Sequence, residues 1–159
     1  MWPFSVFACL AFVISALAVK EPPTKLQIDA TFTPEDCSVK AKSGDGVRVH
    51  YTGTLFATGD KFDSSHDRGQ PLPLTLGVGQ VIQGWDEGLQ GMCVNERRTL
   101  TIPANMAYGR NFPVERSYLS QPYLSTGSRG FGSIIPPNSA LVFEVKLVGL
   151  DSKGAREEL

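Results

Sequence analysis

The chain has 159 residues, 42% of them apolar, and a formal net charge of −1. This length and composition suit one globular domain. The near-neutral charge excludes the basic surface that binding to nucleic acid or to an anionic membrane requires. We therefore expect a single folded domain with no nucleic-acid partner.

Residues 1–18 are predicted to be a cleaved secretory signal peptide. Residues 4–19 are almost wholly apolar, and residues 16–18 read Ala-Leu-Ala, which matches an A-x-A cleavage pattern. The run is too short for a comfortable membrane span, and the polar segment 20–23 follows at once. No basic residue precedes the run, so an uncleaved anchor is the alternative. After cleavage we expect no membrane span.

Cysteine spacing bears on both redox state and metal binding. Of the three cysteines, Cys9 lies in the signal, so the mature chain keeps Cys37 and Cys93. An even pair in a secreted chain indicates a disulfide, with two buried free thiols as the alternative. The spacing does not fit C-x-x-C redox chemistry, and two histidines cannot complete a zinc site. We expect no metal and no cofactor.

The carboxyl-terminal tail, residues 151–159, ends in Arg-Glu-Glu-Leu. These four residues depart from Lys-Asp-Glu-Leu at two positions but keep a basic residue first, Glu third and Leu last. Such tails act as retrieval addresses in the endoplasmic reticulum. Together with the signal peptide, the tail indicates the lumen of that compartment, and secretion is the alternative.

Alternating apolar residues predict the strands of a sheet. Residues 25–32 have the pattern of an edge strand, and residues 47–52 place Val47, Val49 and Tyr51 on one buried face. Further strands are predicted at 72–76 and at three other segments, namely 61–65, 97–102 and 140–150.

Phe62 and Asp63 pose a geometric question, because neighbouring side chains on a strand point to opposite faces. Both can line one cavity only if the strand bends or bulges there. A hairpin turn is expected just before them, at residues 57–60.

One short helix is predicted in the stretch 81–89. Its apolar residues Val81, Ile82, Trp85 and Leu89 have helical spacing and form one stripe, which must be buried against the sheet. Trp85 would then form the floor of any concavity between helix and sheet, although an ordinary core residue is the alternative. A second helical turn is expected at 103–109. The predicted fold class is α+β, with an antiparallel sheet wrapped over one helix.

The usual catalytic arrangements are missing from the sequence pattern. His50 lies within a strand and His66 in a polar loop without a surrounding motif, so no activated Ser or Cys is indicated. Residues 77–79 read Gly-Val-Gly but lack the third glycine of a dinucleotide site. The remaining aromatic and aliphatic residues, with one Asp and two Tyr, suit a neutral apolar ligand or a reaction that needs no nucleophile.

Five motifs in register from about Leu26 to Leu150 resemble the FKBP family of peptidyl-prolyl cis–trans isomerases. They are His50-Tyr51-Thr52-Gly53, Lys61-Phe62-Asp63-Ser64-Ser65, the segment from Gly79 to Leu89, Ala107-Tyr108-Gly109, and the segment from Ile134 to Phe143. The signal, the cysteine pair and the tail are similar to those of the secretory-pathway members, in which the equivalent cysteines are joined.

The resemblance implies a half-barrel sheet around the helix and an apolar pocket between them. The implied substrate- and macrolide-binding residues are Tyr51, Phe62, Asp63, Leu72, Val81, Ile82, Trp85, Tyr108, Ile134, Ile135 and Phe143. Leu72 stands where the family often has Phe, so one pocket wall is aliphatic here.

Four of these residues are implied to be catalytic: Asp63, Tyr108, Trp85 and Phe62. Asp63 would act electrostatically beside the twisting carbonyl, and the Tyr108 hydroxyl would donate to a substrate carbonyl, as would the Ile82 amide. The alternatives are that Asp63 only holds Tyr51 or Arg68 in place and that Tyr108 anchors a loop.

The implied activity is isomerisation of Xaa–Pro bonds in a domain spanning residues 19–150. The implied partners are unfolded proline-containing secretory polypeptides and macrolides such as tacrolimus and rapamycin, and we expect a monomer. Residues 110–127 interrupt the family pattern, either as a partner-binding loop or as an unspliced intron in the gene model. A catalytically weak binding or chaperone module gated by this inserted loop is the alternative function.

Overall fold

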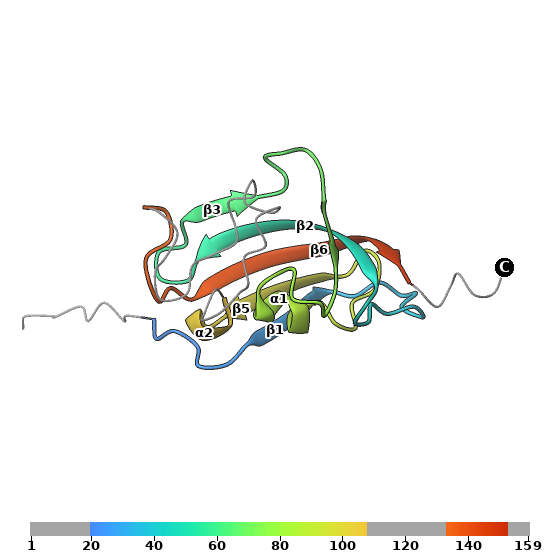
Figure 1. Ribbon diagram of the computed structural model, residues 1–159, viewed down its shortest axis with the longest axis horizontal. Coiled ribbons are helices and arrows are strands. Elements are labelled where there is room, and N and C mark those ends of the chain that lie inside the picture. The colour runs from blue at the N-terminus through green and yellow to red at the C-terminus, as the bar shows by residue number, and fades with distance from the viewer. Residues whose placement is uncertain (1–19, 108–132, 153–159) are drawn as a thin grey trace, which may run out of the picture.

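The structure is a computed structural model that describes residues 20–107 and 133–152 (Figure 1). Its elements in chain order are β1 (Gln27–Phe32), β2 (Gly46–Leu55), β3 (Lys61–Ser64), β4 (Leu72–Thr75), α1 (Gln83–Gly88), β5 (Arg97–Ile102), α2 (Ala104–Ala107) and β6 (Leu141–Asp151). Within these described ranges, no helix is long and apolar enough to cross a membrane.

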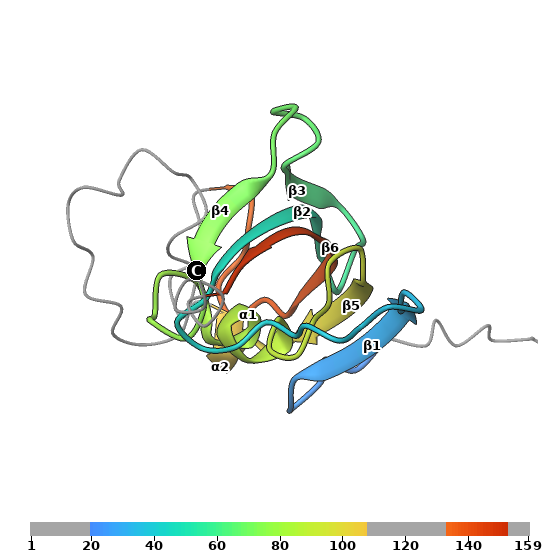
Figure 2. The same ribbon diagram turned by 90° about the vertical axis from the view of Figure 1, so that its right-hand side faces the viewer.

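The strands form one antiparallel sheet in the order β1-β5-β6-β2-β3, and β4 also pairs with β2. The two longest strands, β2 and β6, run side by side from the pair Gly46–Asp151 to the pair Leu55–Leu141. Figure 2 shows that the sheet curves over α1, which lies in its concave side. The predicted α+β class, with a sheet wrapped around one short helix, is confirmed.

The inward faces of the strands are those that alternation predicted. Val47, Val49 and Tyr51 of β2 are buried, and so are Leu100 and Ile102 of β5. On β6 the buried residues are Leu141, Phe143, Val145 and Leu147. The core therefore lies between the concave face of the sheet and α1.

Strand β1 is the edge strand that the sequence predicted, but it contributes little to the core. All six of its residues are exposed. The apolar residues Ile28 and Phe32 remain 45% and 51% exposed. The reason is that, among the described strands, β1 pairs with β5 alone, and it lies to one side of α1 (Figure 2).

Helix α1 is shorter than the predicted stretch, and its backbone lies unusually close to β5. It begins at Gln83 because Ile82 has an extended backbone, with φ −58° and ψ 149°. A Cβ atom added at Gly84 would lie 2.5 Å from the Ile102 side chain, and one at Gly88 would lie 2.8 Å from Leu100. The two glycines therefore let the helix approach the strand. The predicted apolar stripe is buried, with Trp85 only 4% exposed.

A disulfide joins Cys37 to Cys93, as expected, with their Cα atoms 5.3 Å apart. It connects the segment after β1 to the turn that follows α1. The two cysteines are separated by 56 residues in sequence. In the chain-entropy treatment, closing a loop of this size stabilises the fold by about 4 kcal/mol.

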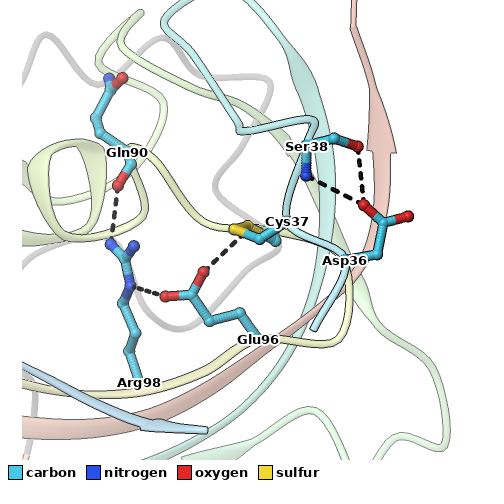
Figure 3. Close-up of a disulfide and its surroundings, with 7 residues drawn as sticks. Asp36, Cys37, Ser38, Gln90, Glu96 and Arg98 are labelled. Atoms are coloured by element: carbon cyan, nitrogen blue, oxygen red, sulfur yellow. Dashed lines mark hydrogen bonds and ion pairs between the residues drawn. A yellow bond between two sulfur atoms is a disulfide. The ribbon is translucent and has the colours of Figure 1, made fainter. Parts of the chain in front are cut away.

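A buried ion pair fastens the end of α1 next to this disulfide (Figure 3). Glu96 accepts a hydrogen bond from the Cys93 amide at 2.8 Å and one from Arg98 Nε at 2.6 Å. Arg98 Nη1 also donates to the carbonyl oxygens of Gly88 and Gln90, both at 2.8 Å. A cation near helix carbonyls complements the helix dipole, so Arg98 links the carboxyl end of α1 to β5.

Because Gly84 lies so close to Ile102, we predict that replacing this helical glycine with alanine destabilises the protein rather than stabilising it. Ala is normally favoured over Gly in a helix by about 1 kcal/mol. Gly84→Ala should instead lower the free energy of unfolding by about 1–3 kcal/mol, because the new methyl group collides with Ile102. Urea denaturation measures the difference. Gln83→Ala, at an exposed position in the same turn, is the control and should change stability by less than about 0.5 kcal/mol. A stabilised Gly84→Ala variant would contradict the packing.

Candidate active site

Four aromatic side chains from four different elements meet between the helix and the sheet. Tyr51 of β2 and Trp85 of α1 have ring centroids 5.0 Å apart, in a T-shaped arrangement. The ring of Phe143 on β6 lies 5.2 Å from Trp85 and 5.6 Å from Phe62 of β3, again edge to face. Edge-to-face packing stabilises such pairs beyond their burial. Trp85 thus lies beneath the concave sheet, where the sequence placed it.

The nitrogen of the Trp85 ring is a buried donor without an acceptor in the part of the chain that the structure describes. A buried donor left unpaired costs about 1–3 kcal/mol, so most such groups find partners.

A β-bulge places Phe62 and Asp63 together, which is the condition that the sequence analysis gave for both side chains to line one cavity. Gly53 pairs with Asp63 and Thr54 pairs with Lys61, so Phe62 is the additional residue between the two pairs. A bulge sets two residues of one strand against one residue of its partner and bends the bulged strand. This bend lets Phe62 join the aromatic cluster while Asp63 bonds to Tyr51 of the same inner face.

Asp63 is held by two donors at the edge of the aromatic cluster. The Tyr51 hydroxyl donates to Oδ2 at 2.5 Å, and Arg68 Nη1 donates to Oδ1 at 2.5 Å. Arg68 Nη2 in turn donates to the Tyr51 oxygen at 2.6 Å, which closes a triangle. The sequence named Arg68 only as a possible partner of Asp63. Its bond to Tyr51 was missed, since nothing in the spacing indicates that the turn folds back over β2.

Burial of the Tyr51 ring, followed by its bond to Asp63, raises the pKa of Tyr51 well above its ordinary value. The hydroxyl therefore stays protonated at neutral pH and donates to the carboxylate. Burial disfavours the charge on Arg68, but the bonds to Asp63 and Tyr51 outweigh it and raise the pKa of Arg68. The triangle is thus a fixed arrangement with one oriented carboxylate.

The other predicted pocket residues fall into three groups. Val81, Ile82 and Ile135 are buried in the same core cluster as the aromatic rings, and Leu72 packs against that cluster. Ile134 is 52% exposed and lies outside the cluster. Tyr108 and the inserted loop 110–127 lie outside the described residues. The catalytic and binding roles of all these residues stay predictions.

Asp86 shapes the segment that leads into α1, and the sequence reasoning missed it. Its carboxylate oxygens accept hydrogen bonds from the amides of Gly77 at 2.9 Å and Gly79 at 3.0 Å. Both glycines have positive φ, at 71° and 72°, a conformation that other residues rarely adopt. Asp86 therefore fixes the turn that places Val81 and Ile82 at the cluster. The available signal was a short acid on the helix that follows a Gly-x-Gly turn.

Two histidines that the sequence treated as isolated are stacked behind the site. The rings of His50 and His66 are 4.6 Å apart and tilted by 11°. His50 Nδ1 lies 2.9 Å from Ser65 Oγ, which accepts a hydrogen bond from the Tyr51 amide at 2.8 Å. Burial, then the neighbouring charges of His66 and Lys146, lower the pKa of His50 below its ordinary value of 6.5.

From this histidine pair we predict that the folded protein loses stability in mild acid. Below about pH 6.5 the unfolded chain binds a proton at His50 more readily than the folded protein, so stability falls as the pH falls. We expect the melting temperature to drop between about pH 7 and about pH 5. His66→Gln should reduce this drop, because it removes the repulsion between the two imidazole cations and leaves the burial of His50 and the charge of Lys146 on β6. Thermal unfolding followed by circular dichroism provides the measurement. Equal drops in the wild type, His66→Gln and His50→Gln would exclude the pair as the cause.

Comparison with known proteins gives consistent matches over most of the chain. Residues 37–148 match the family profile described as FKBP-type peptidyl-prolyl cis-trans isomerase. The chain is 46% identical to FK506-binding protein 2 of Dictyostelium discoideum, over 90% of this chain and 96% of that protein. It is 41% identical to peptidyl-prolyl cis-trans isomerase FPR2 of Saccharomyces cerevisiae, over 94% and 97% respectively. FK506-binding protein 2B of Rhizopus delemar is 48% identical over 91% of this chain, which spans 63% of that longer protein.

Proposed function

The chain belongs to the FKBP family of peptidyl-prolyl cis–trans isomerases, and we propose that it accelerates Xaa–Pro rotation during the folding of secretory proteins in the endoplasmic reticulum. The observation that carries this proposal is the aromatic cluster of Tyr51, Phe62, Trp85 and Phe143 with the oriented carboxylate of Asp63 at its edge. An apolar, aromatic site with one fixed charge suits a reaction that makes no bond to the enzyme.

The chemistry of the amide explains why such an apolar site can catalyse the rotation. Rotation about the peptide bond has a barrier of about 18–20 kcal/mol, because it destroys amide resonance. The twisted transition state has lost the charge separation of that resonance, so it is less polar than the planar amide. It therefore gains more than the ground state on transfer from water to apolar surroundings. Lowering the barrier by about 5 kcal/mol gives a several-thousand-fold acceleration.

We assign roles within the site on this basis. Trp85 forms the floor beneath the proline ring and Phe143 a wall beside it, while the partly exposed Phe62 forms the wall that meets the residue before proline. Asp63, held by Tyr51 and Arg68, acts electrostatically beside the twisting carbonyl. The Ile82 amide and the Tyr108 hydroxyl donate to substrate carbonyls, although Tyr108 lies beyond the described residues.

The proposed substrates are unfolded secretory chains with an apolar residue before proline, since the pocket lining is apolar. Macrolides such as tacrolimus and rapamycin would fill the same pocket. The signal at residues 1–18 and the Arg-Glu-Glu-Leu tail support the endoplasmic reticulum, and both lie outside the described residues. The disulfide is consistent with an oxidising compartment. The proposed domain spans residues 19–150 and acts as a monomer.

Asp63 provides the first test of the mechanism. Asp63→Asn keeps the size of the side chain but removes its charge, so kcat/KM for a Leu-Pro peptide should fall by at least about tenfold, which is about 1.4 kcal/mol of transition-state stabilisation. Asp67→Asn is the matched control, because Asp67 lies on the turn after β3 and its carboxylate pairs with Lys61 at the exposed surface. The control should keep its activity. If both variants are equally active, Asp63 has no electrostatic role in catalysis and only holds Tyr51 and Arg68 in place.

The inserted loop provides the second test. Residues 19–159 are assayed for cis–trans isomerisation of a Leu-Pro peptide, with and without residues 110–127. We expect both forms to catalyse and rapamycin to inhibit both, because the aromatic cluster and Asp63 are built from other segments.

Activity of the shortened form alone would favour a binding or chaperone module gated by the loop. If neither form catalyses, the pocket assignment must be withdrawn. Sequencing the transcript separates the two origins of the loop, since a message that contains all its codons excludes the unspliced intron.

A further inference from the structure

The inner face of β2 has one gap in its row of buried side chains. Every second residue of the strand faces the core, with Val47, Val49 and Tyr51 before the gap and Leu55 after it. The residue between them is Gly53, which is buried and has no side chain. Gly53 ends the motif His50-Tyr51-Thr52-Gly53, in which the sequence alone indicates no role for the glycine.

Two rings of the aromatic cluster fill the gap. A Cβ atom added at Gly53 would lie 2.6 Å from Phe62 Cζ and 2.8 Å from Phe143 Cε1. Real Cβ atoms do not approach other heavy atoms this closely. On β2, Gly53 pairs with Phe143 of β6 on one side and with Asp63 of β3 on the other. The bulge that adds Phe62 to β3 begins at this second pair. The bulge therefore turns the Phe62 side chain inward beside Asp63, and the missing side chain at Gly53 leaves the space that the Phe62 ring occupies.

We propose that Gly53 is a positioning residue that sets substrate specificity by determining where the Phe62 ring stands. This inference rests on the proposed function, in which Phe62 forms a wall of the pocket. A methyl group at residue 53 would have to displace one of the two rings. Phe143 is only 2% exposed and is packed against both Trp85 and Tyr51. Phe62 is half-buried and touches the cluster from one side, so Phe62 is the ring that moves.

Gly53→Ala should therefore weaken recognition of the residue before proline. With Phe62 displaced from Phe143, kcat/KM for a Leu-Pro peptide should fall by about three- to tenfold, the range expected for one lost aromatic contact. A Gly-Pro peptide presents no side chain to this wall and should lose less, so the Leu-Pro to Gly-Pro ratio falls. Gly46→Ala is the matched control. It removes another glycine of β2, but its Cβ atom would be 3.5 Å from the nearest atom, which is an ordinary contact. This control should keep the wild-type ratio.

Rescue separates positioning from general damage. Phe62→Leu shortens the side chain at the point of collision, so Gly53→Ala should have little further effect on the ratio in that background. If Gly53→Ala does not fold but the double variant does, the Phe62 ring is confirmed as the group that occupies the space. If neither folds, the collision lies with Phe143 or the backbone, and the proposal is wrong.

The position of the Phe62 ring can also be measured directly, without relying on isomerase activity. Nuclear Overhauser effects between the rings of Phe62 and Phe143 should be present in the wild type and in Gly46→Ala, and lost in Gly53→Ala. Loss of these signals in a protein without isomerase activity would support the positioning role while overturning the proposed function. Unchanged signals in Gly53→Ala, or an unchanged peptide ratio in an active enzyme, would overturn the positioning role.

Discussion

The close contact between α1 and the concave sheet is the constraint on which the rest of the structure depends. A helix of six residues cannot be stable in water on its own, because nucleation is costly and few hydrogen bonds follow. Its stability comes from burial of one apolar stripe against β5 and β6. Gly84 and Gly88 make the distance short enough for Trp85 to reach the rings of Tyr51 and Phe143. The aromatic cluster therefore depends on the missing side chains at Gly84 and Gly88, which let the helix backbone pack against the side chains of Ile102 and Leu100.

Polar interactions complete this arrangement at both ends of the helix. Asp86 binds the turn before it, and Arg98 binds the carbonyls after it. Arg98 is neutralised by Glu96, which also bonds to the amide of a disulfide cysteine. Because these charges are partly or wholly buried and paired, removing one partner would leave the other without compensation. The helix is thus held by the sheet, by two polar anchors and by a covalent crosslink in one connected region.

Most of the fold could be predicted from the sequence, because period-two alternation marks β2, β5 and β6 so clearly. The bulge at Phe62 was expected only on the condition that Phe62 and Asp63 line one pocket, and that assignment came from the family resemblance rather than from alternation. The interactions that escaped prediction depend on distances between segments. Nothing in the spacing of His50 and His66 indicates stacking, and nothing places Arg68 over Tyr51. The exposure of β1 was also missed, because alternation does not report how far the covering helix extends.

The bulge that carries Phe62 gives the site two parts with unequal freedom. The base of the cluster belongs to α1, which is held at both ends, whereas Phe62 lies on a short edge strand and is only partly buried. Such a division lets an enzyme accept many polypeptides without losing the geometry that its chemistry requires. The proline would meet a rigid surface, and the preceding residue would meet an adaptable one. Broad substrate tolerance would then be a property of the β3 edge rather than of the pocket as a whole.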